Sequence, residues 1–548
     1  MQPSSGGRRS PEIADSVSKV IGILVPRRSA VNSLPCWSKT VTKDTVTIPA
    51  ELEVKFLMPR GTESALAGYL GLHGDGIDEA VTRQEVTTYF DTPEQDLSRH
   101  GATLRVRRTE SGRVQTLKMR SEGSPAFARG EWEWTLGSDN PEPERLASTP
   151  LVSILGGLGQ LEPVFTTDVR RTTRTFQLDG ALIEAAIDLG SVRAGSAAEE
   201  ICELELELKG GKVAQLYKLA ATLRAELPLT LGAESKADRG WRLRTGHPRA
   251  PEKSVEIALA PDVTSSEAIR RILNGTLANL MANLPAAVAG QAAGVHNMRI
   301  AIRRLRAALA LFHQHLAGST EARLTAELRR LGRVLGEARD WDVFCTETLP
   351  KAAEDGVAKP LLEIMRVRAG AARADAHSGL SAELAGSALT ALVLDLAAWA
   401  EDPAALAGSP DGGALHTPLK TLAPALEARL ERKARRRGKH IRQRSEEELH
   451  SLRKALKRLR YGIEFLAPLH HTKRVNAYLK GCKALQEHLG VINDAAVAVS
   501  LAERLSAKEP SLTLVTAALK AWTDHRGNEA RQHLRKAWRT FKEASLPT

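Results

Sequence analysis

The sequence of 548 residues has few aromatic residues, few cysteines and no long apolar run. Its four cysteines are widely scattered, and no two of them form a CxxC pair. This spacing argues against a zinc ribbon or a disulfide framework. The longest apolar run, Ala388–Ala400, contains Asp395 and is shorter than the ~20 residues that a membrane helix needs. We therefore predict a reduced, cytoplasmic protein without a membrane span.

Aromatic residues make up only 4% of the chain, whereas Lys and Arg outnumber Asp and Glu by 77 to 65. A net charge of +12 predicts anionic partners, although a generally basic soluble protein would show the same excess. Scarce aromatics argue against base stacking, and we find no helix-turn-helix, zinc-finger or RNP motif. Nucleic acid is therefore a disfavoured partner, but RNA binding stays open because phosphate contacts need no aromatic ring.

The character of the chain changes near residue 250, which predicts several domains. Residues Val20–Val25 are apolar but too few for a signal-peptide core, so we interpret the start as a disordered extension rather than a targeting peptide. Prolines mark a linker before the helical half. The predicted segments are the extension 1–48, a strand-rich domain 49–245, a linker 246–261, a helical domain 262–505 and a helical tail 506–548.

Short segments of alternating apolar and polar residues recur through the first half, separated by Gly, Pro, Ser and Asp. Such spacing predicts an antiparallel barrel or tunnel of eight strands with one distinct interior. Helices are expected near Glu63–Leu72 and Val213–Leu227. The predicted strands are Glu51–Leu57, Glu85–Phe90, Thr103–Arg108, Arg113–Lys118, Glu131–Leu136, Thr172–Leu178, Leu182–Asp188 and Glu203–Leu208.

Two glutamate ladders occupy the first and last of these strands. Residues at i, i+2 and i+4 of a strand share a face, so the ladders would repel each other unless cations lay between them. We expect them to face each other across a shared interior that holds Mg²⁺ or Mn²⁺, which prefer oxygen ligands. The simpler interpretation is an exposed strand face paired with Lys and Arg. The candidate metal ligands are Glu51, Glu53, Asp188, Glu203, Glu205 and Glu207.

Basic side chains with the same alternation lie between the two ladders. Ammonium and guanidinium groups bind phosphate oxygens, the latter often through two hydrogen bonds. Together with a metal they would position a phosphate chain and neutralise charge during phosphoryl transfer. The candidate phosphate ligands are Lys55, Arg105, Arg107, Lys118, Arg171 and Lys236.

The helical half contains an internal repeat, in which His296 and Asp340 recur 154 positions later as His450 and Asp494. Each copy places apolar residues on one helix face and basic residues on the opposite face. A solvated basic face is the simpler interpretation, but its duplication favours a bound polyanion, most simply polyphosphate. The basic run Arg432–Arg444 would extend this track. The candidate polyphosphate ligands are His296, Arg299, Arg303, Arg306, His450, Arg453, Lys457 and Arg460.

Several motifs of the first half resemble the CYTH domain of triphosphate tunnel metalloenzymes over about residues 49–245. These motifs are Glu51-x-Glu53-x-Lys55, Leu104-Arg105-Val-Arg107, Leu117-Lys118, Ala186-Ile-Asp188-Leu-Gly190, Ile201–Leu208 and Ser235-Lys236-Ala-Asp-Arg239-Gly240. The paired His-x-x-Arg-x-x-x-(Arg/Lys)-Arg-Leu-Arg blocks resemble the CHAD domain over about 262–505, with halves near 262–401 and 414–505. This order of domains is similar to that of bacterial inorganic triphosphatases.

The resemblance implies an α+β multidomain protein, with an eight-stranded antiparallel tunnel followed by an all-α bundle with two-fold pseudosymmetry. It implies a metal-dependent inorganic triphosphatase with a polyphosphate-binding module, located in the cytoplasm and associated in some cases with polyphosphate granules. The alternatives are an adenylate cyclase, a nucleoside or thiamine triphosphatase on the same tunnel, or a non-enzymatic polyphosphate-binding protein. The residues implied to act in catalysis are Glu51, Glu53, Lys55, Glu205 and Lys236.

Overall fold

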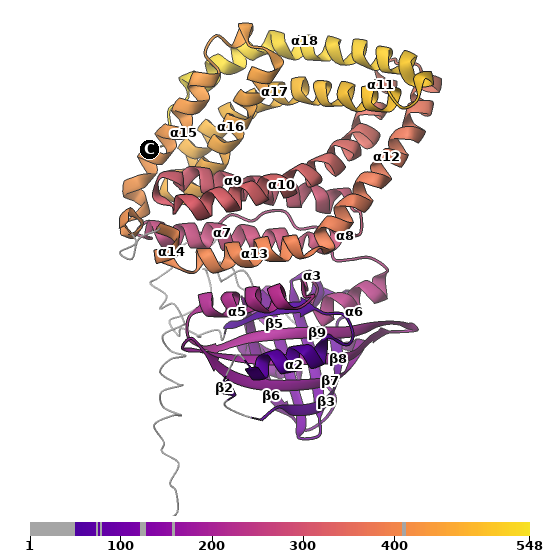
Figure 1. The fold of residues 1–548 in the computed structure, drawn as a ribbon, viewed down its shortest axis with the longest axis vertical. Helices are drawn as coiled ribbons and strands as arrows, with labels where there is room; N and C mark the ends of the chain where they lie inside the picture. Colours follow the sequence, from indigo (N-terminus) through magenta and orange to yellow (C-terminus); the bar gives the residue numbers. More distant parts are fainter. Residues whose placement is uncertain are drawn as a thin grey trace, which may run out of the picture. The chain divides into compact units, whose positions relative to one another are not determined.

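The computed structural model describes residues 50–72, 75–76, 79–120, 128–155, 159–407 and 413–547. Its internal contacts divide the chain into two compact units (Figure 1). The boundary along the chain lies between Pro248 and Arg249. The first unit is mainly β-sheet and the second is helical. The predicted extension 1–48 lies outside the described residues.

An antiparallel sheet of ten strands forms the first unit. Its strands are β1 (Ala50–Leu57), β2 (Asp75–Gly76), β3 (Val81–Asp91), β4 (Ala102–Thr109), β5 (Gly112–Arg120), β6 (Ala128–Leu136), β7 (Glu162–Leu178), β8 (Ala181–Ala194), β9 (Ala197–Gly210) and β10 (Thr230–Leu231). All eight predicted strand segments fall within strands of this sheet. Two further strands have only two residues each: β2 pairs with β7, and β10 pairs with β1.

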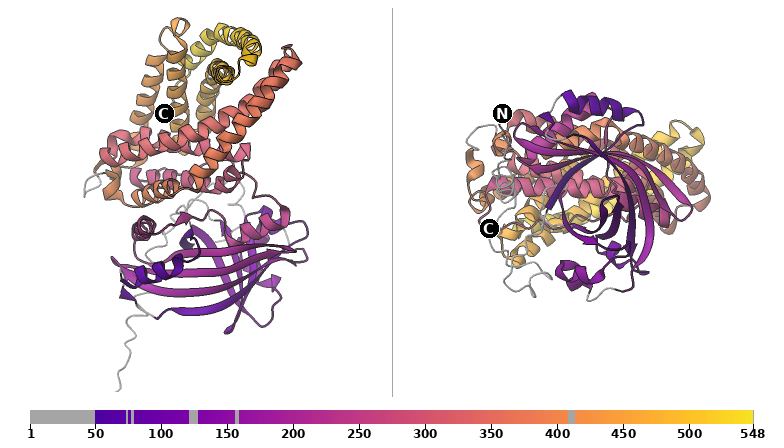
Figure 2. Two further views of the ribbon diagram at one scale, coloured as in Figure 1. Left: turned by 45° about the vertical axis from the view of Figure 1, so that its right-hand side comes forward. Right: turned by 90° about the horizontal axis from the view of Figure 1, so that it is seen from below.

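The strand pairings return to the strand from which they start. They run β1–β6–β5–β4–β3–β7–β8–β9, and β9 pairs again with β1. β1 achieves this by pairing with β6 through Ala50–Leu52 and with β9 through Glu53–Leu57. Figure 2 (right) shows the strands curving around a common interior. The predicted β-domain of antiparallel strands is therefore confirmed.

Strand alternation sends apolar and charged residues of this unit to opposite faces. Leu104 and Val106 of β4 are buried against Leu97, Leu146 and other apolar residues on the outer face. The arginines that alternate with them point to the inner face, so the apolar core lies outside the ring. The helices of this unit are α2 (Thr62–Leu72), α3 (Asp96–Arg99), the 3₁₀ helix η1 (Pro143–Ser148), α4 (Pro150–Leu155), α5 (Val213–Glu226) and α6 (Lys236–Thr245).

Tight turns fix the register of the long strands. β7 and β8 are joined by Asp179 and Gly180 alone, and both residues have positive φ, at 49° and 77°. This is the two-residue hairpin turn that matches the natural twist of antiparallel strands. It sets Arg171 opposite Asp188, which positions both side chains for the site described below.

The second unit is built of helices and short 3₁₀ or π turns. Its longer helices are α7 (Ser265–Ala282), α9 (Ala292–Phe312), α10 (Gly318–Val343), α12 (Lys359–Ala385), α13 (Ser387–Ala400), α15 (Leu419–Arg437), α16 (Glu446–Leu466), α17 (Thr472–Ser506) and α18 (Thr513–Glu543). Its shorter helices are α8 (Leu284–Val288), η2 (His313–His315), η3 (Phe344–Thr348), α11 (Leu349–Glu354), α14 (Pro403–Ala407), η4 (Gly413–His416), η5 (Ile441–Gln443), η6 (Ala467–Leu469) and η7 (Pro510–Leu512). The predicted helical character of this half is confirmed.

The two repeated basic blocks form α9 and α16, which contact each other. Their apolar faces are fully buried, as Met298 and Leu305 of α9 and Leu452 and Leu459 of α16 show. The two-fold relation between whole halves stays a prediction. The tail beyond residue 506 forms α18, which packs along α17.

Among the described helices, none passes a length and hydropathy test for a membrane span by itself. α12 and α13 pass it only as a pair bent by 53°. Within the described part of the chain, Cys202, Cys345 and Cys482 are free thiols.

Candidate functional site

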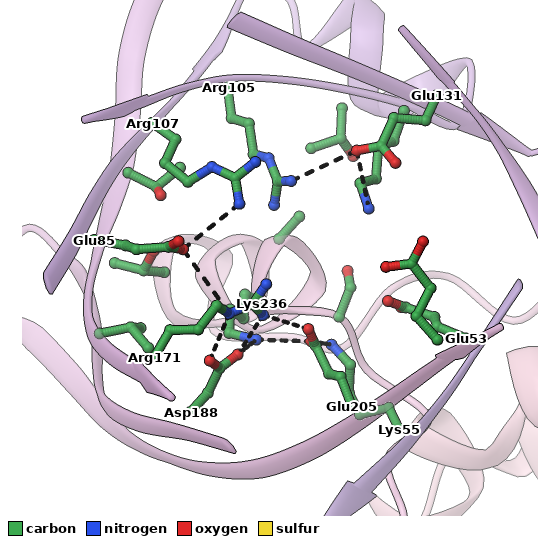
Figure 3. Close-up of a pocket in the computed structure, with 18 of the residues that line it drawn as sticks. Glu53, Lys55, Glu85, Arg105, Arg107, Glu131, Arg171, Asp188, Glu205 and Lys236 are labelled. Atoms are coloured by element: carbon green, nitrogen blue, oxygen red, sulfur yellow. Dashed lines mark hydrogen bonds and ion pairs between the residues drawn. The ribbon is translucent and has the colours of Figure 1, made fainter. Parts of the chain in front are cut away.

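A charged cavity of about 220 Å³ lies within the first unit (Figure 3). It exists because the inward positions of successive strands carry acids and bases instead of apolar side chains. Such a lining suits a charged ligand and disfavours an apolar one. The charged residues that line it are Glu53, Lys55, Glu85, Arg105, Arg107, Lys118, Glu131, Glu133, Arg171, Glu184, Asp188, Glu205, Glu207, Lys209 and Lys236.

Three carboxylates meet on one side of this cavity. Asp188 on β8 lies opposite Glu203 on β9, and Glu205 follows on the same face of β9. Both Asp188 and Glu203 are fully buried. One oxygen of each of the three carboxylates lies within 4.8 Å of the others. Because hard divalent cations prefer oxygen ligands, this group could hold a metal ion.

Cations surround the same three carboxylates. Lys236 Nζ lies 2.6 Å from Asp188 Oδ2 and 2.8 Å from oxygens of both Glu203 and Glu205. Lys55 Nζ lies 2.7 Å from Glu205. Arg171 binds Asp188 through Nε and a terminal nitrogen, and its guanidinium also contacts Glu205. The predicted metal ligands and the predicted phosphate ligands are thus paired with each other.

The start of α6 brings Lys236 to this group. Ser235 is the N-cap, and its Oγ accepts a hydrogen bond from Asp238 N while the Asp238 carboxylate accepts one from Ser235 N (3.1 and 2.9 Å). This capping box fixes the first turn of the helix. Arg239, one turn after Lys236, lies 2.5 Å from Glu203. Gly240 permits this docking, because a Cβ there would lie 2.2 Å from the ring of Phe165.

The ion pairs hold these buried groups in their charged forms. Burial by itself favours the neutral amine of Lys236, but Asp188, Glu203 and Glu205 raise its pKa well above the usual value. Burial likewise opposes the Glu205 carboxylate, yet Lys236 and Lys55 hold its pKa well below the usual range. The wall therefore carries fixed charges before any ligand arrives.

A second basic wall lies across the cavity, formed by β4, β5 and β6 (Figure 3). Lys118 lies 3.3 Å and Arg105 3.7 Å from Glu131. Arg107 contacts Glu133 at 3.2 Å. A ligand in the cavity would thus meet cations from two opposite sides.

Glu53 differs from the other predicted acidic ligands. It lines the cavity, but its carboxylate has no hydrogen bond or ion pair with the described residues. Its negative charge affects Lys55 only electrostatically, by raising the pKa of that amine. Glu51 lies in β1, and its side chain is outside the described part of the structure. Glu207 pairs with Lys209 at 2.6 Å.

The expected arrangement of the two glutamate ladders is wrong in one respect. They lie side by side on neighbouring strands, with Glu53 opposite Glu207 and Lys55 opposite Glu205, instead of facing each other across the interior. Closure of the strand pairings brings the first and last strands of the ring together. Both ladders still contribute to one cavity, together with Asp188.

A first basic cluster lies in the helical unit between α9 and α16, and we define it as Arg299, Arg303, Arg453, Lys457 and Arg460. These side chains act on one another through space. Within the described residues, neither Arg303 nor Lys457 has an ion-pair partner, and the Nε atoms of Arg303 and Arg453 are buried without a hydrogen bond. Arg299 and Arg453 each contact one aspartate, Asp340 at 3.2 Å and Asp494 at 3.6 Å.

The other predicted polyphosphate ligands occupy distinct positions. His296 lies near Arg299 and Arg303, and burial together with these cations lowers its pKa. His450 Nδ1 donates to Asn493 Oδ1 at 2.6 Å. The charges that act most strongly on Arg306 are those of Arg458 and Arg329, which lie outside the first basic cluster. The basic stripe predicted on α9 therefore borders two groups of cations.

Comparison with family models covers most of both units. The model of the CYTH domain matches residues 49–241, and that of the CHAD domain matches residues 271–503. The chain is a CYTH domain followed by a CHAD domain. The cavity with its three carboxylates lies in the CYTH domain, and the first basic cluster lies in the CHAD domain.

An inorganic triphosphatase of Haemophilus influenzae is 33% identical over 165 residues, which are 28% of this chain and 45% of that relative. The match thus spans less than half of that relative. A CHAD domain from the plant Ricinus communis is 26% identical with a TM-score of 0.49, covering 55% of this chain and 99% of that chain. PptA from Streptomyces chartreusis is 17% identical with a TM-score of 0.40, covering 50% and 100%. At these TM-scores the two structures add nothing to the family assignment.

Sequence reasoning missed several residues of the CYTH cavity. Glu85, Glu133 and Lys209 line it, and Arg239 contacts Glu203 beside it. Lys209 could have been predicted from strand alternation, because it lies two positions after Glu207 and therefore on the same face of the strand. Arg239 could have been found from its i+3 spacing to Lys236 in a capped helix.

Proposed function

We propose that the CYTH domain is a metal-dependent inorganic triphosphatase and that the CHAD domain binds inorganic polyphosphate. The observation that carries the first part is the cavity, in which cations on two opposing walls enclose a space of about 220 Å³. Triphosphate presents anionic oxygens in every direction, and such walls match it. Identity of 33% to an inorganic triphosphatase over 165 residues supports this substrate.

In the proposed reaction, water attacks a terminal phosphorus, the adjacent P–O anhydride bond breaks, and pyrophosphate leaves. Charge that develops on the phosphoryl oxygens is stabilised by Lys55, Arg171 and Lys236. Their carboxylate partners hold these cations in position beforehand, so little reorganisation is needed when the substrate binds. Arg105, Arg107 and Lys118 bind the substrate from the other wall.

The residues present fit Mg²⁺ or Mn²⁺, because the donors are carboxylate oxygens. Asp188, Glu203 and Glu205 would hold an ion in competition with Lys236 and Arg171. Glu53, which has no ion pair within the described part of the chain, is the carboxylate that is most available to it. When bound, the ion supplies Lewis-acid polarisation of phosphate oxygens and a more acidic water.

A substrate panel tests this proposal. Purified protein is given triphosphate, ATP, thiamine triphosphate or long-chain polyphosphate, each with Mg²⁺, with Mn²⁺ or with a chelator. We expect release of phosphate chiefly from triphosphate and only with metal. Faster turnover of ATP, or formation of cyclic AMP, would favour the nucleotide alternatives. Tight binding without turnover of any substrate would favour a non-enzymatic binder.

The first basic cluster supports the second part of the proposal. Arginines with buried, unsatisfied Nε atoms and a lysine without an ion pair, among the described residues, are costly unless an anion joins them. The variant Arg299→Gln with Arg453→Gln should lose most of its affinity for polyphosphate, measured by calorimetry. Unchanged affinity would place the binding site elsewhere.

A further inference from the structure

A second basic cluster lies beside the first in the CHAD domain. It gathers six cations from four helices: Arg306 on α9, Arg329 on α10, Lys433 and Arg437 on α15, and Lys454 and Arg458 on α16. Arg458 is the centre of the cluster, because it interacts electrostatically with all five other cations. Its charge lowers the pKa of Arg306, Lys433 and Lys454. The charges of Arg437 and Arg329 in turn lower the pKa of Arg458. Arg306 is among the candidate polyphosphate ligands, and Lys433 and Arg437 lie in the basic run Arg432–Arg444 that is expected to extend their track.

These six cations have no ion-pair partner among the residues that the structure describes. Among the largest charge effects on Arg306, Lys433, Lys454 and Arg458, only that of Glu447 on Lys454 comes from an acid. Arg306, Lys433 and Arg458 are half-buried, so solvent screens them only in part. Burial and mutual repulsion lower the pKa of each of these three. An anion would relieve a repulsion that the fold leaves uncompensated.

Half of the second cluster, namely Lys433, Arg437 and Lys454, does not follow from the internal repeat. The positions 154 residues before Lys433, Arg437 and Lys454 are Asn279, Asn283 and Ile300. Asn279 and Asn283 donate hydrogen bonds to the backbone oxygen of Glu252 and serve the local structure. The additional charges are therefore built into one half of the domain only.

The two clusters are adjacent on α9. Arg306 lies three residues after Arg303, which is a rise of about 4.5 Å along the helix axis. Facing them, α10 carries Gly332 and Gly336, and a Cβ at these positions would lie 3.9 and 4.0 Å from the guanidinium groups of Arg306 and Arg299. A chain of phosphates that leaves the first cluster can thus continue along α9 into the second.

We infer that the second basic cluster is a further polyphosphate subsite, through which the CHAD domain selects long chains over short ones. This inference rests on the proposed binding of polyphosphate. Among the described residues none of the six cations stacks on an aromatic ring, whereas sites for single-stranded nucleic acid typically offer such rings to the bases. The cluster is suited to a ligand recognised by its charge alone.

The test uses the full-length protein with the substitutions Lys433→Gln and Arg458→Gln. Neither side chain has an ion pair or hydrogen bond with a described residue, so the variant should fold and melt at or above the wild-type temperature. The matched control, Arg366→Gln with Arg539→Gln, removes the same charge from exposed residues that pair within their own helices. Calorimetry without divalent metal then measures binding of tetraphosphate, of long-chain polyphosphate and of a single-stranded RNA of similar charge to the long chain.

We expect the variant to lose about tenfold or more in affinity for the long chain, with the short chain changed less than about twofold. Its dependence on salt for the long chain should also weaken. An equal loss for both lengths, an equal loss in the control, or tighter binding of RNA than of polyphosphate would overturn the inference. If the wild type binds polyphosphate of neither length, the proposed function itself fails, which is a different result.

Discussion

At the scale of single residues, Lys236 neutralises the buried carboxylates of the CYTH cavity. Its ammonium contacts Asp188, Glu203 and Glu205 within 2.8 Å, and all four groups are buried. Breaking a buried ion pair from one side leaves a charge in a medium that solvates it poorly. Lys236 is therefore as important for the stability of this wall as for binding a phosphate.

The substitution Lys236→Gln should lower the free energy of unfolding by about 2 kcal/mol or more, because three carboxylates lose a shared cation. A divalent cation can replace part of the missing charge. We expect Mg²⁺ or Mn²⁺ to raise the melting temperature of the variant more than that of the wild type, in a thermal shift assay. Equal shifts in both proteins would contradict competition between Lys236 and a metal ion for these carboxylates.

Lys457 should couple polyphosphate binding to pH. Burial and the neighbouring Arg453, Arg303 and Arg299 lower its pKa to about 6, so the amine is mostly neutral at pH 7 to 8 in the free protein. A bound polyanion favours the ammonium form, and binding then takes up a proton. Affinity should rise as the pH falls from about 8 to about 6 and level off below. Asp494 and His450 also interact electrostatically with this amine.

Calorimetry in two buffers of different ionisation enthalpy measures this proton uptake directly. Lys457→Arg should reduce it by up to one proton, because a guanidinium stays charged throughout. The control Lys520→Arg makes the same change at an exposed position on α18. Equal uptake in the wild type and Lys457→Arg would assign the proton to the histidines instead.

At the scale of elements, the capping box of α6 positions Lys236, which lines the cavity, and Arg239, which contacts Glu203 beside it. Removing it with Asp238→Ala should cost about 1 kcal/mol of stability. It should also lower kcat/KM for triphosphate, because Lys236 and Arg239 lie in the first turn of this helix. Asp238→Glu retains an acid at the N3 position and should retain both properties. Activity and melting temperature that stay at wild-type values in Asp238→Ala would contradict this role.

The strands could be predicted from the sequence, but the position of α6 against the sheet could not. Alternation such as Leu104-Arg105-Val106-Arg107 is a local signal with one structural meaning. The ten-residue α6 is short and polar, and its position depends on the close approach of Gly240 to Phe165, which lies 75 positions earlier in the chain. Contacts between distant segments of this kind have no local signal.

The ion pairs that form within the site could not be predicted from the sequence either. Residue types identified Asp188, Glu205 and Lys236 as members of one site. Whether their charges bind a ligand or each other depends on distances of a few ångströms that strand register sets. The same holds in the CHAD domain, where the sequence groups Arg306 with Arg303, whereas the charge that acts most strongly on Arg306 is that of Arg458.

At the scale of the whole molecule, the chain forms two compact units with separate sites. We therefore expect two transitions in scanning calorimetry. Lys236→Gln should lower only one of them, and long-chain polyphosphate should raise the other, because a ligand stabilises the unit that binds it. A single transition that responds to both changes would show that the units unfold together.

The most direct measurement is metal-dependent hydrolysis of triphosphate by Glu53→Gln beside the control Glu94→Gln. Glu53 lines the cavity without an ion pair to any described residue, so its loss should leave the melting temperature unchanged. Glu94 is exposed and lies outside the residues that line the cavity. We expect kcat/KM to fall by about 100-fold or more in Glu53→Gln and to stay within about twofold in Glu94→Gln. Full activity of a folded Glu53→Gln protein would contradict a metal-dependent reaction in this cavity.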